Sequence, residues 1–167
     1  DAKSVFAADV DGDGDMDALS ASLLDDEVTW YENDGASPPG WTARTIATTA
    51  DGAASVFAAD VDGDGDMDAL SASSADDKIA WYENDGASPP AWTARTIATM
   101  ANGASSVYAA DVDGDGDVDA LSASGFGNDI EWYENKGGQF GLATASTAPS
   151  GIVENLVDDV LRVGMTH

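Results

Sequence analysis

A nine-residue stretch rich in aspartate, present three times, constrains this chain more than any other feature. Asp9-Val-Asp-Gly-Asp-Gly-Asp-Met-Asp17 returns unchanged at residues 60–68, and it returns at residues 111–119 with Val118 in place of methionine. Each copy carries an aspartate at every second position, so a bare loop repels itself. A hard cation such as Ca²⁺, which takes six to eight oxygen ligands, reverses the sign of that interaction. The spacing therefore predicts one calcium site in each copy, about three Ca²⁺ per chain.

The predicted ligands occupy positions 1, 3, 5, 7 and 9 of each loop, with a main-chain oxygen at position 7 and a last carboxylate that closes the cage. Position 6 is a glycine, Gly14 in the first copy, where the chain must turn sharply around the ion. The predicted metal-site residues are Asp9, Asp11, Asp13, Asp15 and Asp17, then Asp60, Asp62, Asp64, Asp66 and Asp68, then Asp111, Asp113, Asp115, Asp117 and Asp119.

The alternative for a single copy is a solvated acidic turn, because Asp-Gly pairs mark hairpins. Three copies with one ligand spacing favour a metal site. A helix–loop–helix calcium site is not expected, because its position 12 should be a bidentate glutamate and is here Ser20, Ser71 or Ser122. The flanking segments 4–8 and 18–22 are short and β-compatible, so each loop is predicted at the tip of a β-hairpin.

The whole chain repeats with the loops, since Asp9, Asp60 and Asp111 are 51 residues apart. Four strands are predicted in each unit. In the first unit they lie near residues 5–9, 18–22, 28–32 and 42–48. Four short strands at a period of roughly 40–50 residues are typical of propeller blades. The predicted fold class is therefore all-β, with three tandem four-stranded propeller-type blades whose hairpin loops bind calcium, plus a divergent C-terminal segment.

The predicted organisation is a three-repeat array over residues 1–140, with repeats near 4–54, 55–105 and 106–140, followed by a divergent segment over 141–167. Gly151–His167 aligns with Gly52–Asp68, but leucine, valine and histidine replace loop aspartates at positions 161, 163 and 167. The apolar residues from Ile152 to Leu161 also have helical spacing. We expect a short helix or turn and then a strand, packed outside the blades.

The motif Ala7-Ala-Asp-Val-Asp-Gly-Asp-Gly-Asp-Met-Asp-Ala-Leu-Ser-Ala-Ser22, followed by Trp30-Tyr-Glu-Asn33, resembles the FG-GAP/VCBS-type repeats. Such repeats form calcium-binding blades in the propeller of integrin α subunits and in many secreted bacterial proteins. The resemblance covers about residues 1–140 and implies that the loop aspartates are the calcium ligands. It also implies a secreted, extracellular or cell-surface location.

Composition excludes several classes of function. The net charge is −26, and nucleic acids and anionic membrane surfaces both require a basic patch, so neither is an expected partner. There is no cysteine, which excludes disulfides and thiolate metal sites. No apolar run approaches the roughly 20 residues of a membrane span, so membrane insertion is not expected. The single histidine, His167, cannot complete a Ser-His-Asp site, and near-identical repeats do not offer the two different carboxylate environments of an acid/base pair. We expect no enzymatic activity.

The aromatic residues allow two interpretations. Trp30, Trp81 and Trp132, each followed by a tyrosine, are predicted to fill the space between blades, with a sugar-stacking platform as the alternative. Trp41 and Trp92 follow Pro-Pro turns and are the better candidates for exposure. Arg44 and Arg95 are expected to pair with nearby acids.

The leading functional hypothesis is a non-catalytic, extracellular calcium-binding module for adhesion or for binding a protein or carbohydrate ligand. A second is a structural subunit of a self-assembling ring or filament. A third is an accessory domain of a secreted polysaccharide-degrading enzyme. Because a closed propeller needs ~4–8 blades and three leave unpaired edges, a homo-oligomer or filament is expected. Its contacts should include residues 4–10 and the apolar tail residues within 151–167.

Overall fold

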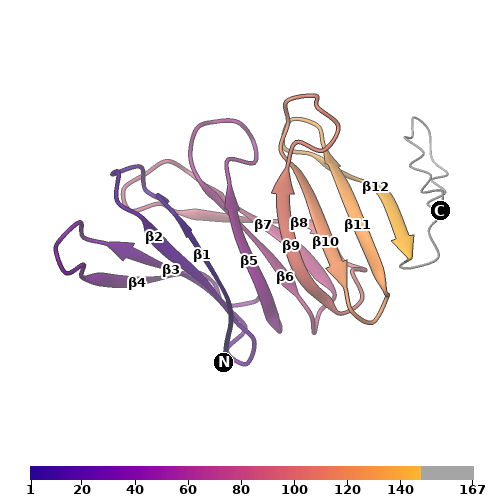
Figure 1. Ribbon diagram of the computed structural model, residues 1–167, viewed down its shortest axis with the longest axis horizontal. Coiled ribbons are helices and arrows are strands. Elements are labelled where there is room, and N and C mark those ends of the chain that lie inside the picture. Colours follow the sequence, from indigo (N-terminus) through magenta and orange to yellow (C-terminus); the bar gives the residue numbers. More distant parts are fainter. Residues whose placement is uncertain (148–167) are drawn as a thin grey trace.

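Three four-stranded antiparallel sheets make up the described part of the chain (Figure 1). The computed structural model describes residues 1–147, a range that contains strands, turns and no helix. Within that range, therefore, no helix has the length and apolar character needed to cross a membrane. The strands are β1 Ala2–Ala8, β2 Asp17–Ser22, β3 Glu27–Asn33, β4 Trp41–Ala47, β5 Ala53–Ala59, β6 Asp68–Ser73, β7 Lys78–Asn84, β8 Trp92–Ala98, β9 Ala104–Ala110, β10 Asp119–Ser124, β11 Asp129–Asn135 and β12 Phe140–Thr147.

Each sheet is a simple meander in which successive strands pair along the chain, β1 to β4, β5 to β8 and β9 to β12. The four strands predicted for each repeat are confirmed, and each sheet is one blade. The third blade is longer than expected, because β12 begins at Phe140 and continues to Thr147, past the boundary predicted at residue 140. The predictions for Gly151–His167 lie outside the described residues.

The sequence of β3 shows why these segments form strands. Val28, Trp30 and Glu32 alternate with Thr29 and Tyr31, as a period of two requires. Val28, Thr29 and Trp30 are all buried, and Val28 and Trp30 belong to the core shared with the second blade. Valine, threonine and aromatic side chains suit such a strand because they pack well on a pleated surface.

The blades stand side by side in a fan, with the first strand of each nearest to its neighbours (Figure 1). β1 packs beside β5, and β5 beside β9. Phe6, Phe57 and Tyr108 hold equivalent positions on these strands and form a ladder with ring centroids 4.4 and 4.6 Å apart. Residues 1–147 form two apolar cores, one between the first and second blades and one between the second and third.

Candidate metal centres

Each aspartate-rich loop joins the first strand of a blade to the second, as predicted, and the three loops lie at the same end of the blades (Figure 1). Strand pairing runs up to the loop on both sides: Ala8 faces Asp17, Ala59 faces Asp68, and Ala110 faces Asp119. The hairpin therefore fixes both ends of each loop, and the residues between them adopt a closed turn.

Backbone N–H groups fold the first loop around its own carboxylates. Asp9 Oδ2 accepts from Gly14 N at 3.0 Å, Asp11 Oδ1 from Asp13 N at 3.3 Å, and Asp13 Oδ1 from Asp15 N at 2.8 Å. The second and third loops repeat these bonds. In the first loop these bonds use one oxygen of each carboxylate. In the second and third loops, Asp60 and Asp111 each accept loop N–H groups at both oxygens.

Glycine at position 6 has the role that the sequence predicts. Gly14, Gly65 and Gly116 have φ of 96°, 101° and 102°, a conformation that L side chains rarely adopt. The turn at these glycines bends the loop so that its carboxylates converge.

The carboxylates converge on one point in each loop. One oxygen from each of three aspartates lies within 4.8 Å of the others in every copy. These groups are Asp9, Asp11 and Asp13 in the first blade, Asp60, Asp62 and Asp68 in the second, and Asp111, Asp113 and Asp115 in the third. The predicted ligands at positions 1 and 3 are therefore brought together in all three loops.

Position 9 of the loop is an anchor as well as a candidate ligand. Asp17 is almost completely buried, its Oδ2 accepts from Val10 N at 3.0 Å, and its Oδ1 accepts from Asn33 N at 2.8 Å. Asp68 and Asp119 make the same two bonds. Only in the second loop does the position-9 residue, Asp68, join the three-carboxylate group. Burial raises the pKa of Asp68 to about 6, above its ordinary range, so a nearby cation would favour its charged form.

The side chain at position 7 points away from the cluster, as expected where the main-chain oxygen is the ligand. Asp117 Oδ2 accepts from Gly137 N at 3.2 Å. In the first two blades this carboxylate lies against a glycine of the turn after the third strand. A Cβ added at Gly35 would lie 2.2 Å from Asp15 Oδ2, and one added at Gly86 would lie 2.3 Å from Asp66 Oδ2.

The local chemistry fits a cation. Asp9 Oδ1 is buried and has no hydrogen-bond partner among the described residues. The pKa of Asp11 is raised by burial and then by the charge of Asp13, and the pKa of Asp62 is raised by burial and then by Asp64. An oxygen without a donor, beside carboxylates that oppose one another's ionisation, is the environment that a hard cation stabilises.

One set of residues at these sites was not predicted from the sequence. Asn33, Asn84 and Asn135 end the third strand of each blade, and their side-chain amides donate to the carbonyls of Met16, Met67 and Val118 inside the loops. Asn84 also donates to Val10 O of the preceding blade at 3.1 Å, and Asn135 to Val61 O at 2.8 Å. The thrice-repeated Trp-Tyr-Glu-Asn was the available signal.

The aromatic and basic residues lie where packing requires them. Trp30 and Trp81 are buried between blades, as the packing interpretation predicts, whereas Trp132 is only partly buried. Trp41 is 51% exposed, but Trp92 is partly buried against the core between the first and second blades. Arg44 pairs with Glu32 and Arg95 with Glu83, each at 2.5 Å, and each guanidinium also lies over the tryptophan of its own blade. The predicted pairing of these arginines with acids is confirmed.

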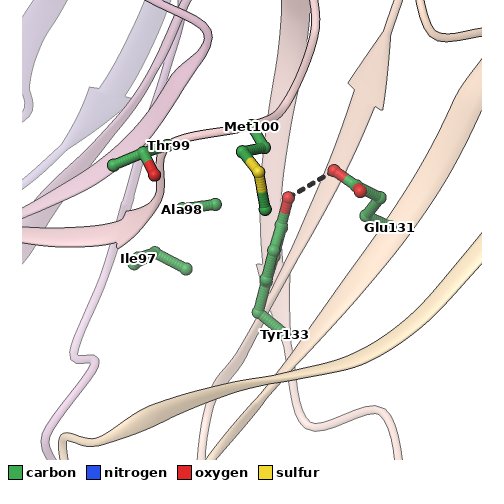
Figure 2. A pocket seen from close by; sticks show the side chains of 6 residues that line it. All are labelled: Ile97, Ala98, Thr99, Met100, Glu131 and Tyr133. Atoms are coloured by element: carbon green, nitrogen blue, oxygen red, sulfur yellow. Dashed lines mark hydrogen bonds between the residues drawn. The ribbon is translucent and has the colours of Figure 1, made fainter. Parts of the chain in front are cut away.

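A cavity of about 220 Å³ opens between the second and third blades (Figure 2). Its lining is Ile97, Ala98, Thr99, Met100, Glu131 and Tyr133. The Tyr133 hydroxyl donates to Glu131 at 2.5 Å, and both burial and this bond raise the pKa of Tyr133. The lining contains a single carboxylate, so this cavity does not supply the two carboxylates that a glycosidase uses.

Blades of this topology with acidic first loops define a β-propeller-type repeat array. Residues 9–71 and 60–122 each match the FG-GAP-like repeat. Together the two matches span more than half of the chain, which therefore belongs to the FG-GAP-like repeat family.

A solved structure of a protein from Lactobacillus plantarum is similar to this chain, with a TM-score of 0.54 and 15% sequence identity. The similarity covers 90% of this chain but only 42% of the other, and it supports a propeller-like fold. No curated protein matches the sequence.

Proposed function

We propose that this chain is an extracellular calcium-binding β-propeller-type module that binds a protein or carbohydrate ligand and has no catalytic role. The observation that carries the calcium assignment is the convergence of three carboxylate oxygens in each of three loops, with Asp9 Oδ1 buried and without a donor. All the candidate ligands are oxygens, which Ca²⁺ prefers, and no described residue offers a thiolate or imidazole.

Calcium stabilises the fold in this proposal because its ligands repel one another without it. Fifteen of the 32 acidic residues lie in the three loops. A cation that binds the folded loop and not the unfolded chain adds its binding free energy to the stability of the protein.

Calorimetric titration with Ca²⁺ tests the assignment directly. Three near-equivalent sites with Kd of ~10⁻⁴–10⁻³ M are expected, the range of extracellular modules. Mg²⁺ should compete poorly, because it demands a tighter octahedron. Excess EDTA should lower the melting temperature, and an unchanged melting curve would exclude calcium as a structural ion. A preference for Mg²⁺, or fewer than three ions per chain, would also count against the proposal.

A single substitution separates the sites. Asp11→Ala should weaken one site and leave the loops at Asp60 and Asp111 nearly intact, because repeats couple mainly to their neighbours. The titration should then fit two sites of wild-type affinity and one weaker site. Uniform loss at all three would contradict independent loops.

The calcium affinity also bears on location. A Kd near ~10⁻³ M suits only a compartment rich in calcium, whereas sites of intracellular sensors bind at ~10⁻⁷–10⁻⁵ M. Micromolar or tighter binding would therefore argue against an extracellular module.

The ligand class is open to a direct screen. Trp41, on the outer strand β4, presents a half-exposed indole of the type that stacks on sugars. Glycan binding that depends on calcium and is lost in Trp41→Ala would support a carbohydrate-binding role. A glycan array without signal would leave a protein ligand as the proposal.

A further inference from the structure

The two interfaces inside the array are copies of one interface. Each is formed by what we call the forward face of one blade and the back face of the next. The forward-face residues are Leu19, Ala21, Val28 and Trp30 in the first blade and Leu70, Ala72, Ile79 and Trp81 in the second. The back-face residues are Val56, Ala58, Ala69 and Tyr82 in the second blade and Val107, Ala109, Ala120 and Tyr133 in the third. All sixteen are buried, and the two interfaces account for the two apolar cores.

The third blade has a forward face that no described residue covers. Ile130 is 55% exposed, whereas its counterpart Ile79 is fully buried. Val112, in the third acidic loop, is 44% exposed, whereas Val61 is 2% exposed. The remaining forward-face residues, Leu121, Ala123 and Trp132, are only partly buried.

The first blade has the complementary deficit. Val5 is 73% exposed, whereas its counterparts Val56 and Val107 are 3% and 4% exposed. Ala7 is exposed, whereas Ala58 is buried. A back face and a forward face are therefore both open, at opposite ends of the array (Figure 1).

The polar contacts of the interface have a direction. At the interior interfaces the back face donates: Val56 N donates to Ser4 Oγ at 3.3 Å, and Asn84 Nδ2 donates to Val10 O at 3.1 Å. The second interface repeats both bonds, from Val107 N to Ser55 Oγ at 3.2 Å and from Asn135 Nδ2 to Val61 O at 2.8 Å.

At the open ends, the equivalent donors are Val5 N and Asn33 Nδ2, and the equivalent acceptors are Ser106 Oγ and Val112 O. If two forward faces met, the Val112 carbonyl of each copy would face another acceptor. If two back faces met, donors would face donors. Only a back face set against a forward face satisfies both contacts.

From this complementarity we propose that a second copy of this chain docks head to tail, with the back face of its first blade on the forward face of the third blade. Val5 of one copy fills the site beside Ile130 of the other. The Val5 N–H donates to Ser106 Oγ, and Asn33 donates to the Val112 carbonyl. Such a contact is heterologous, so it closes into a ring when the rotations sum to a full turn. Two copies give six blades, within the ~4–8 of closed propellers.

The test uses two variants that each damage one face. Val5→Glu and Ile130→Glu put a charge at the centre of the back and forward faces. Both residues are exposed in the single chain, so both variants should fold. Leu24→Glu is the matched control, because Leu24 is 75% exposed and its counterpart Ala75 stays exposed although blades flank it on both sides.

Light scattering on the full chain in millimolar calcium, over a concentration series, measures the mass of the species formed. The wild type and Leu24→Glu should form species of at least twice the 17.0 kDa chain mass, and each face variant alone should fall to that mass. An equimolar mixture of the two face variants should recover a dimer, because each contributes its intact face.

Three outcomes would overturn the proposal. One is a folded wild-type monomer at the highest concentration reached, and another is a mixture that stays monomeric. The third is that Ile130→Glu or Val5→Glu alone associates as strongly as the wild type. That result would mean that the copies meet through some other surface.

Discussion

Asp17→Ala distinguishes an anchor from a metal ligand at position 9 of the loop. The Asp17 carboxylate is 1% exposed and accepts the Val10 and Asn33 N–H groups at 3.0 and 2.8 Å. Alanine leaves both donors without an acceptor in a buried site. Each buried N–H left without an acceptor costs about 1–3 kcal/mol, so the free energy of unfolding should fall by about 4 kcal/mol. This loss should be present in EDTA, because neither bond involves an ion.

Asp13→Ala is the matched control. Asp13 is exposed, belongs to the three-carboxylate group of the same loop, and accepts one backbone bond, from Asp15 N. In EDTA its loss should change stability by less than about 1 kcal/mol. In ~5 mM Ca²⁺ it should lose the binding contribution of one site, about 1–2 kcal/mol for Kd of ~10⁻⁴–10⁻³ M.

Urea denaturation of the wild type and both variants, each with calcium and with EDTA, provides the comparison. The cost of Asp17→Ala should be nearly the same in the two conditions, and the cost of Asp13→Ala should depend on calcium. If Asp17→Ala is harmless in EDTA and harmful only in calcium, Asp17 is a ligand and the anchoring argument is wrong.

Two further substitutions have matched comparisons, and a third prediction concerns pH. Gly86→Ala should be more destabilising than Gly63→Ala in thermal melts, because both glycines have positive φ but only at Gly86 does a Cβ meet a carboxylate; equal costs would contradict this. In dilute solution Asn84→Ala should cost about 1 kcal/mol more than Asn33→Ala, the net contribution of its additional bond to the preceding blade, and equal losses would mean that this bond adds nothing. N–H groups of the turn that follows Asp34 hold the pKa of its carboxyl below the ordinary value. The stability that this carboxylate contributes is therefore present above pH ~4 and is lost as pH falls through the lower folded pKa. A carboxyl NMR titration of Asp34 with a midpoint at or above ~3.9 would contradict this prediction.

The strands and loops were predictable because their signals are local. The alternation from Val28 to Glu32 and the aspartate spacing from Asp9 to Asp17 each lie within one element, where the side-chain period and the ligand geometry act directly. The same holds for the number of blades, which follows from the repeat. The repeat pattern fades near Phe140, although β12 still pairs with β11 up to Thr147, so the local pattern does not reveal the full length of that strand.

The sequence does not show which loop aspartates anchor the loop and which are candidate metal ligands. All five positions hold the same residue, so the spacing alone assigns each of them to the ion. The structure separates Asp17 because the third strand brings the Asn33 N–H against it, a contact 16 residues away along the chain. Likewise, nothing local in the sequence marks Ser4 or Asn84 as bridges between blades, because their partners are 52 and 74 residues distant.

The acidic loop is also part of the interface between blades. Val10 N is held by Asp17, and Val10 O accepts the amide of Asn84 in the next blade. One peptide segment therefore lies between the carboxylate cluster and the neighbouring blade. A cation bound in the loop would also fix the direction of this carbonyl, so each site would stabilise the contact that follows it in the array. In the third blade the corresponding carbonyl belongs to Val112, on the open forward face. Calcium in that loop would thus orient the acceptor that the Asn33 amide of a second copy requires, and chelation should weaken the contact between copies as well as the blades themselves.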